Sequence, residues 1–291
     1  MKKTAPSGII LLNKKCGVTS FQALGEIKRA LGSGKVGHTG TLDKFACGLL
    51  VVLTGRALKL SPWFSACEKQ YLGKIYFGRE TDTLDPEGNV IAEADLPARE
   101  SVENVLGQFT GDIMQSPPAY SAIHINGKRA SDLARSGKAP EMKQRPVTIY
   151  SLELRSWQPP FAEIFVHCSS GTYIRSLARD IALAAGSRAH LVELVRTQVA
   201  GFKLGSGEWK AQSGELPLPV TKSVINSLGL PFFEVAPADV QPIIHGKPLE
   251  VILQNAAKLP CDDGPAAVFS GDSLVAIVEK SGSKWKYCCV F

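Results

Sequence analysis

The chain has 291 residues, of which 44% are hydrophobic and 21% are charged. This length suffices for one large domain and a smaller one, and the composition is that of an ordinary globular protein. No apolar run reaches the ~18 residues of a membrane span, and the apolar patch at residues 9–12 is too short for a signal peptide. These features exclude a helical membrane protein and predict a cytoplasmic one.

Cysteine and histidine usage argues against a metal or disulfide scaffold. The seven cysteines are an odd number without any C-x-x-C pair, and the five histidines are dispersed. Such a pattern is typical of a reducing compartment. We therefore expect no disulfide framework, no structural metal and no cofactor.

The net charge of +6 is unevenly distributed. From Phe232 to the C-terminus, five lysines face seven acidic residues, so this segment is slightly acidic and the remainder is basic. A basic body suits an anionic partner such as a nucleic acid. Ordinary surface charge would give the same totals, so the charge alone does not decide between these interpretations.

Apolar runs and helical spacing predict the elements of the first half of the chain. Strands are predicted over residues 9–12, 49–53, 71–77 and 89–94, with a turn at 85–88. A helix capped by Thr19 or Ser20 should bury Phe21, Leu24, Ile27 and Leu31 and end at Gly32. Two more helices are predicted, over residues 56–65 with Pro62 as a kink or boundary, and from a Ser101 cap through Phe109.

In the second half, Asn126-Gly127 predicts a two-residue hairpin. Strands are predicted over residues 146–154, 161–168 and 190–199, and helices over residues 129–135 and 173–185. Residues 205–219 are polar and rich in Gly, Ser and Pro, which predicts a connection. From about residue 231, short apolar runs between turns predict a small all-β barrel or sandwich.

The segment 37–50, GHTGTLDKFACGLL, places one carboxylate on a glycine-punctuated loop next to a buried strand. Because a rigid scaffold can hold a polar group of such a loop in a partly dry site, Asp43 is a candidate for chemistry. Considered alone, an aspartate in such a loop is more commonly a turn residue that binds its own backbone.

Other segments supply residue types that such a site needs. Tyr71 begins a strand, and Tyr173 and Arg175 stand at the start of a helix after a glycine turn. A guanidinium can hold a carboxylate ionised through two parallel hydrogen bonds, so Arg175 is a suitable partner for Asp43. His38 lies in the same loop segment as Asp43. Each residue by itself has a simpler explanation in the core or on the surface.

The set of motifs is more specific than any member. Three motifs occur in order along the chain: GHTGTLD…GLL, KQYLGKIYFGRETDTLDPEG and SSGTYIRSLARD. The segment LLNKKCGVTS precedes them, and the chain also contains QSPPAYSAIHINGKRASDLARSG, RPVTIY and AHLVELVRT. Together they resemble the bacterial tRNA pseudouridine-55 synthase family, the stand-alone TruB type. The resemblance covers residues 8–200.

The resemblance implies an α+β fold, with a mixed, mainly antiparallel sheet, flanking helices and a small C-terminal β-barrel-like (PUA-like) domain. It implies a catalytic domain over residues 1–229, with an RNA-gripping insertion at about 116–145, and a PUA-like domain over 230–291. By position in the motifs, Asp43 matches the catalytic aspartate, Arg175 its ion-pair partner and Tyr71 the tyrosine that stacks on the uracil. Substrate binding is implied for His38, Tyr173, Leu194 and Lys14.

The implied reaction isomerises uridine 55 in the T-loop of tRNA. It breaks the N-glycosidic bond, rotates the uracil and rejoins it through carbon, without a redox cofactor, phosphate donor or metal. Asp43 could act as a nucleophile at the sugar or base, or as a base at C2′, and the sequence does not choose between these routes. The uridine must leave its stack, and stacking on an aromatic wall offsets this with about 1–3 kcal/mol per base. We expect the T-stem and loop of tRNA as partner and a monomeric enzyme.

The sequence departs from the family pattern near the catalytic loop. Lys44 stands where the family has proline, Cys47 replaces a small hydroxyl residue, and Asn13-Lys14-Lys15 replaces Asp-Lys-Pro. If Lys44 lies near Asp43, its charge should favour the ionised carboxylate.

Three alternatives remain open from the sequence. The chain could be a non-catalytic RNA-binding protein or tRNA folding chaperone, or a guide-RNA-dependent pseudouridine synthase. A glycosidase is disfavoured because it needs paired carboxylates, and neither Asp85 in a turn nor Asp180 on a helix has a reason to converge on Asp43.

Overall fold

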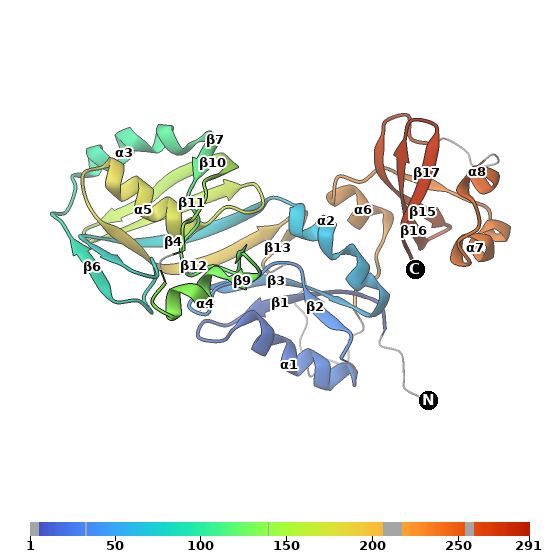
Figure 1. Ribbon diagram of the computed structural model, residues 1–291, viewed down its shortest axis with the longest axis horizontal. Coiled ribbons are helices and arrows are strands. Elements are labelled where there is room, and N and C mark those ends of the chain that lie inside the picture. The colour runs from blue at the N-terminus through green and yellow to red at the C-terminus, as the bar shows by residue number, and fades with distance from the viewer. Residues whose placement is uncertain (1–5, 33, 139, 206–216, 254–258) are drawn as a thin grey trace.

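The computed structural model describes residues 6–32, 34–138, 140–205, 217–253 and 259–291 (Figure 1). A nine-stranded sheet has the path β1-β3-β12-β4-β11-β10-β7, with β2 beside β3 and β13 beside β12. Its strands are β1 (Gly8–Lys14), β2 (Val36–His38), β3 (Cys47–Thr54), β4 (Lys69–Phe77), β7 (Gly111–Gln115), β10 (Arg145–Gln158), β11 (Phe161–Cys168), β12 (Ala189–Val199) and β13 (Phe202–Lys203). Among the described strands of this sheet, only the β12–β3 pairing is parallel. The mixed, mainly antiparallel sheet is therefore confirmed.

Helices cover this sheet in two places. Helices α3 (Arg99–Leu106) and α5 (Ile174–Ala184) lie together over β4, β10, β11 and β12, as Figure 1 shows at its upper left. Val105 of α3 and Ile181 of α5 share one core with Ile75 and Ile164 of the sheet. Helix α1 (Ser20–Leu31) covers the other end of the sheet, against β1 and β3.

Strands β1 and β3 are buried on both faces, which explains why they read as continuous apolar runs. In β3, Leu49, Val51 and Leu53 face one core, and Leu50 and Val52 face the core under α1. Side chains alternate between the faces of a strand, so a strand covered on both sides needs apolar residues at every position.

Helix α1 begins and ends as predicted. Thr19 forms a capping box with Gln22, and Gly32 adopts the left-handed conformation that closes the helix. The prediction for Phe21 is wrong, since this side chain is 71% exposed with the Lys28 ammonium 4.5 Å from its ring centroid.

The predicted helical segment 56–65 with a boundary at Pro62 is confirmed as two elements, and one other helix prediction needs correction. A 3₁₀ helix (Gly55–Leu60) is followed by α2 (Ser61–Ala66), and Pro62 lies in the first turn of α2, where its missing N–H carries no penalty. Helix α3 begins at Arg99 with Ala98 as N-cap, so Ser101 is inside the helix and does not cap it.

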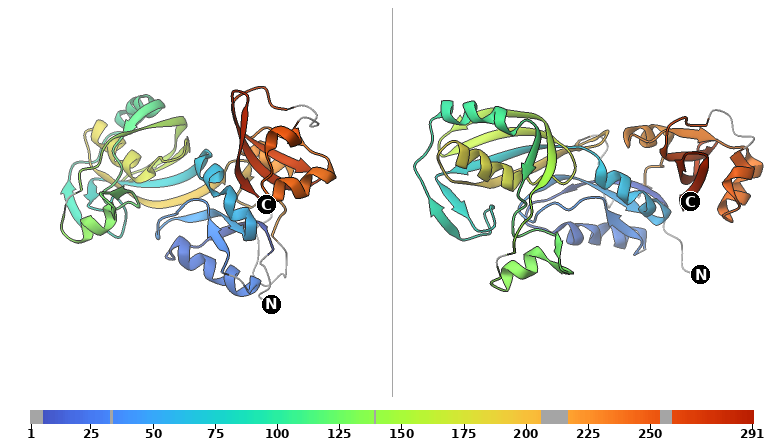
Figure 2. Two further views of the ribbon diagram at one scale, coloured as in Figure 1. Left: turned by 45° about the vertical axis from the view of Figure 1, so that its right-hand side comes forward. Right: turned by 45° about the horizontal axis from the view of Figure 1, so that its top comes forward.

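Short elements extend away from the sheet. Strands β5 (Arg79–Thr81) and β6 (Val90–Glu93) pair with each other. The hairpin β8 (His124–Ile125) and β9 (Lys128–Arg129) turns at Asn126-Gly127, both with positive φ, and leads into α4 (Ala130–Arg135). Figure 2 shows α4 projecting below the sheet.

The C-terminal part contains a second sheet of order β14-β15-β16-β17. Its strands are β14 (Phe232–Glu234), β15 (Gly264–Ser270), β16 (Ser273–Ser281) and β17 (Lys284–Val290), preceded by α6 (Lys222–Ser227). The all-β prediction is wrong, because two apolar runs lie in α7 (Pro237–Ile244) and α8 (Leu249–Ile252). Pro237 at the helix start and Asp239 in the first turn both favour a helix there. The predicted connection at 205–219 lies mostly outside the described residues.

The C-terminal sheet packs on the main sheet. Phe269 and Ile277 share a core with Leu49 and Val51 of β3, and Lys59 Nζ donates to the Val290 carbonyl at 2.6 Å. A separate core joins this sheet to α7 and α8. No described helix is long and apolar enough to cross a membrane.

Candidate active site

The loop between β2 and β3 is held through its backbone. Six successive carbonyls, from Thr39 to Lys44, each accept a hydrogen bond. The donors are Ser65 Oγ to Thr39 (2.7 Å), Arg196 Nη2 to Gly40 (3.1 Å), Arg196 Nη1 to Thr41 (3.5 Å), Ser20 Oγ to Leu42 (3.0 Å), Ala46 N to Asp43 (3.2 Å) and Gly17 N to Lys44 (2.8 Å). Because all these groups are satisfied by fixed elements, the loop presents Asp43 from a rigid frame.

A pocket of about 430 Å³ opens beside this loop. Its walls come from the Asp43 loop, α2, β4, β12, the segment 120–122, the β9–α4 insertion and the start of α5. Five of the predicted site residues line it: Asp43, Tyr71, Tyr173, Arg175 and Leu194. His38 and Lys14 are outside the lining.

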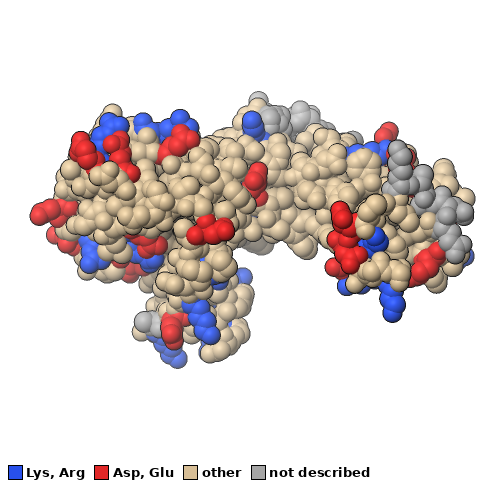
Figure 3. Space-filling model, turned by 90° about the horizontal axis from the view of Figure 1, so that it is seen from above, with Lys and Arg blue, Asp and Glu red and all other residues tan. Residues whose placement is uncertain are grey.

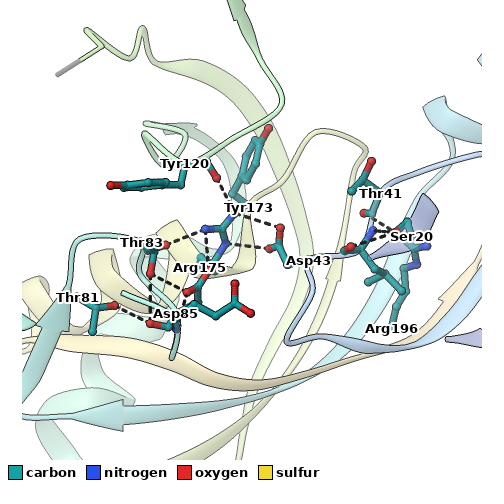
Figure 4. Close-up of polar contacts among 12 residues, drawn as sticks. Ser20, Thr41, Asp43, Thr81, Thr83, Asp85, Tyr120, Tyr173, Arg175 and Arg196 are labelled. Atoms are coloured by element: carbon teal, nitrogen blue, oxygen red, sulfur yellow. Dashed lines mark hydrogen bonds and ion pairs between the residues drawn. The ribbon is translucent and has the colours of Figure 1, made fainter. Parts of the chain in front are cut away.

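Asp43 and Arg175 form an ion pair in this pocket (Figure 4). Arg175 Nη2 donates to Oδ1 at 3.2 Å, and Nε lies 2.9 Å from Oδ2 without hydrogen-bond geometry. The arginine side chain is 4% exposed, whereas the Asp43 side chain keeps 37% of its surface open. The pair therefore leaves the carboxylate accessible from the pocket.

Arg175 is itself fixed by the turn that precedes β6. Its Nη1 donates to the Thr83 carbonyl at 2.7 Å and to Asp85 Oδ2 at 3.1 Å, and its Nη2 donates to the Tyr120 carbonyl at 3.0 Å. Asp85 thus converges on the guanidinium that binds Asp43, contrary to the prediction. Asp85 is 7% exposed and outside the pocket lining, so it cannot serve as a second carboxylate towards a ligand there.

The groups around Asp43 shift the pKa of its carboxyl in opposite directions, with a net rise. Burial raises the pKa of the Asp43 carboxyl, Arg175 opposes this rise, and the negative charge of Asp85 adds to it. Lys14 lowers it slightly. Asp43 is therefore a stronger base than a free aspartate, although it is paired with an arginine.

The two tyrosines stand at fixed positions in the pocket. Tyr71 is 7% exposed, and burial raises the pKa of its phenol to about 12, so the hydroxyl stays neutral. Tyr173 caps α5, and the Gln115 amide binds both its backbone N–H (2.8 Å) and its carbonyl (3.1 Å). Burial raises the pKa of the Tyr173 phenol, and the charges of Arg145 and Arg175 oppose this rise.

His38 and Lys14 lie outside the pocket lining, and Lys14 supports the loop through its backbone. Lys14 is 1% exposed and donates to the carbonyls of Val18 (2.7 Å), Lys15 (3.1 Å) and Lys44 (3.5 Å). His38 lies half-buried on β2, and burial lowers its pKa with a contribution from Arg196. The implied substrate contacts of these two residues have no counterpart in the pocket lining.

The departures from the family pattern lie beside the pocket. Lys44 turns to Glu87, with 3.0 Å between Nζ and Oε1, so it is not among the charges that shift the pKa of Asp43. Cys47 is half-buried, and burial together with the neighbouring Cys16 thiol raises its pKa to about 11. Neither side chain belongs to the pocket lining.

Sequence reasoning missed four supporting residues: Asp85, Arg196, Lys69 and Gln115. Asp85 was visible only as a turn residue, and the partners of Arg196 and Gln115 lie far away in the chain. Lys69 binds the nearby carbonyls of Ser65 and Cys67, but only the fold places it in the pocket wall. Within the described residues, no cluster of three or more His, Cys, Asp or Glu side chains is arranged for a metal.

The acid–arginine pair in a pocket on a mixed sheet makes this pocket the candidate active site of an enzyme. Residues 28–174 match the family model described as TruB family pseudouridylate synthase (N terminal domain). The chain belongs to this family, and its reaction class is that of an isomerase.

Bacterial relatives agree with this assignment. The chain is 45% identical over 201 residues to tRNA pseudouridine synthase B of Borreliella burgdorferi (strain ZS7), covering 68% of this chain and 71% of the relative. The protein of the same name from Francisella philomiragia is also 45% identical over 201 residues, covering 68% and 67%.

The fold is similar to that in "Crystal Structure of a Cbf5-Nop10-Gar1 Complex", with a TM-score of 0.70 at 24% identity over 97% of this chain and 85% of the other. It is also similar to "Structure of H/ACA RNP bound to a substrate RNA containing 2'-deoxyuridine", with a TM-score of 0.68 at 23% identity over 94% and 77%.

Proposed function

We propose that this protein converts uridine 55 in the T-loop of tRNA to pseudouridine, with Asp43 as the catalytic residue. The observation that carries this proposal is the Asp43–Arg175 pair, which holds an accessible carboxylate in a pocket of about 430 Å³. The names of the bacterial relatives support tRNA as the substrate.

In the proposed reaction, the target uridine leaves the T-loop and enters the pocket. Tyr71 and Leu194 lie in its walls, and we propose that the uracil stacks on Tyr71. Asp43 then acts at the nucleotide, as a nucleophile or as a base at C2′. Arg175 keeps Asp43 oriented and favours its ionised form.

We propose that the insertion at about 116–145 grips the T-stem. Its residues Tyr120, Ser121 and Arg129 already line the pocket, so RNA held by the insertion would lie next to Asp43. The face drawn in Figure 3 carries charges of both signs at its two ends and on the lobe that projects at the lower left, with few charges in between.

We also propose the division into a catalytic domain, residues 1–229, and an RNA-binding PUA-like module, residues 230–291. The separate core under α7 and α8 supports a distinct module. Its packing on β3 would fix where this module meets the RNA.

The test is site-mapped pseudouridine formation on an unmodified tRNA transcript, without added protein or guide RNA. Wild-type protein should modify uridine 55, and Asp43→Asn should lose at least about a thousandfold in rate while still binding tRNA. Asn keeps the shape of the side chain but cannot act as a nucleophile or base.

The alternatives predict other results. A tRNA folding chaperone would bind and refold tRNA with no pseudouridine formed by the wild type. A guide-RNA-dependent enzyme would be inactive until a guide RNA and partner proteins were added. Full activity of Asp43→Asn would refute the catalytic assignment.

A further inference from the structure

Two buried cations lie in the pocket wall and have no part in the proposed chemistry of Asp43. Lys69 on β4 and Arg196 on β12 both line the pocket and are 8% and 2% exposed. The strands are neighbours, with Arg196 paired to Tyr71 in the register. The structure therefore concentrates positive charge beside the tyrosine proposed to stack on uracil.

Only neutral groups satisfy these cations within the described residues. Arg196 Nε donates to the Leu49 carbonyl at 2.7 Å, and its remaining donors bind the carbonyls of Gly40 and Thr41. Lys69 Nζ donates to the carbonyls of Ser65, at 3.0 Å, and Cys67. Burying a cation without a carboxylate partner costs free energy. Two such cations side by side in a pocket wall therefore suggest that their charge serves the function of the pocket.

Both cations face the same part of the loop. A Cβ placed on Gly40 would lie 3.6 Å from Arg196 Nη1 and 4.0 Å from Lys69 Cε. Arg196 also lies near the Tyr71 phenol, whose pKa its charge lowers. Both cations therefore place positive charge at the pocket wall beside Tyr71.

The proposed reaction creates a negative charge that needs such a site. When the bond between C1′ and N1 breaks, its electron pair leaves with the uracil, and the charge spreads over N1, O2 and O4. Asp43 can balance only the positive charge left on the sugar. The base becomes neutral again when C5 bonds to C1′, and the proton then lost from C5 is balanced by a proton gained at N1. Fixed donors in a dry pocket stabilise such a charge far better than water does.

We propose that Lys69 and Arg196 stabilise the negative charge that develops on the uracil while it is detached from the sugar. This inference rests on the proposed function, because it assigns a role to the same pocket. Arg196 also holds the Asp43 loop, so its removal would disturb the fold, and Lys69 is the residue to test.

The pKa of Lys69 predicts how the reaction rate should depend on pH. Burial lowers this pKa to about 8, and the charge of Arg196 adds to the effect. The other titratable groups around Lys69 are Cys67, Cys168 on β11, Tyr71 and, across the pocket, Asp43. Burial raises the pKa of both thiols, that of Cys168 to about 11, so they titrate above Lys69. The charge of Lys69 is therefore present below pH 8 and lost above it.

The experiment compares Lys69→Met with Lys69→Arg in single-turnover reactions on a T-stem-loop RNA carrying uridine or 5-fluorouridine. With uridine, Lys69→Met should slow the step at least about tenfold at saturating RNA, with unchanged RNA affinity. The deficit should shrink with 5-fluorouridine, because fluorine itself stabilises the uracil anion. Wild-type rates should fall above pH 8, and Lys69→Arg should lack this fall because a guanidinium stays charged.

An equal loss on both substrates would mean a structural role and would overturn the inference, as would an unaffected Lys69→Met. A second measurement is independent of catalysis: the ionisation of bound 5-nitrouracil, followed by its absorbance. Its pKa should be lower on the wild type than on Lys69→Met, and equal values would also overturn the inference. Failure of the wild type to modify RNA would refute the proposed function, and the 5-nitrouracil titration would still decide the role of Lys69.

Discussion

Asp85 and Arg175 form a buried ion pair, with 3.1 Å between Oδ2 and Nη1, across 90 positions of the chain. Asp85 Oδ1 is occupied by the Thr83 hydroxyl at 2.6 Å and the Glu87 N–H at 3.0 Å. One carboxylate therefore organises its own turn and positions the arginine that binds Asp43. The turn at residues 82–88 therefore helps to hold Arg175 in position beside Asp43.

Replacing Asp85 by alanine should destabilise the protein and slow catalysis. Arg175 would lose a buried partner, a change that costs about 3–5 kcal/mol. Urea denaturation measures the loss, and pseudouridine mapping measures the rate. Asp85→Asn should be milder, because its amide oxygen still accepts from Thr83 and Glu87. Wild-type stability in Asp85→Ala would show that Arg175 does not depend on this pair.

The acid side of the pH–rate profile should report Asp43. Burial raises the pKa of Asp43, so activity should fall, as pH decreases, at a higher pH than an ordinary aspartate would give. Asp85 contributes to the rise. Asp85→Asn should therefore move this limb to lower pH, since a neutral side chain no longer opposes ionisation of Asp43. A shift of the acid side of the profile to higher pH would contradict the conclusion that the charge of Asp85 raises the pKa of Asp43.

Gly48 should not tolerate a side chain. Its φ is +99°, and a Cβ there would lie 2.5 Å from the Arg196 carbonyl oxygen, where β3 meets β12. Gly48→Ala should lower the free energy of unfolding by more than about 3 kcal/mol, because both strain and a backbone clash act. Gly17→Ala is the matched control: φ is +82° with nothing within 4 Å, so only the strain of about 1–2 kcal/mol applies. Thermal unfolding compares the two, and equal losses would rule out the clash.

Binding of tRNA should depend on salt through the insertion. Lys128 and Lys138 are exposed and line a hollow of about 600 Å³ with Arg129 and His124. Replacing both lysines by alanine should weaken tRNA binding and reduce the slope of log K against log salt by about 2, since each phosphate contact contributes about 1. Lys74→Ala, on β4, is the control and should leave the slope unchanged. An unchanged slope in the double variant would place the RNA elsewhere.

The ion pair between Lys44 and Glu87 should contribute little. The side chains are 52% and 49% exposed, and pairs of this kind contribute about 0–1 kcal/mol. Glu87→Gln should therefore retain stability within about 1 kcal/mol and near wild-type activity. A large loss of rate would mean that this bridge holds the Asp43 loop in place of the proline of the family.

Strong local patterns made much of the fold predictable. The capping box at Thr19, the Asn126-Gly127 turn and the doubly buried β3 run each have one locally favoured structure, and all are confirmed. The failures occurred where local patterns were ambiguous. Short apolar runs such as Ile243-Ile244 are compatible with a strand or a helix. In the structure this run ends α7, and Ile243 packs in the core between that helix and the second sheet.

For the active site, the sequence alone determined the family and the residues to examine first, Asp43, Tyr71 and Arg175, because their motifs are contiguous and ordered. Only the tertiary structure decided what surrounds them. Asp85 and Arg196 act across gaps of many residues, through the Arg175 guanidinium and through carbonyls of the Asp43 loop. Such contacts leave no period or motif in the chain, since any buried polar group must find its partner wherever the fold brings one.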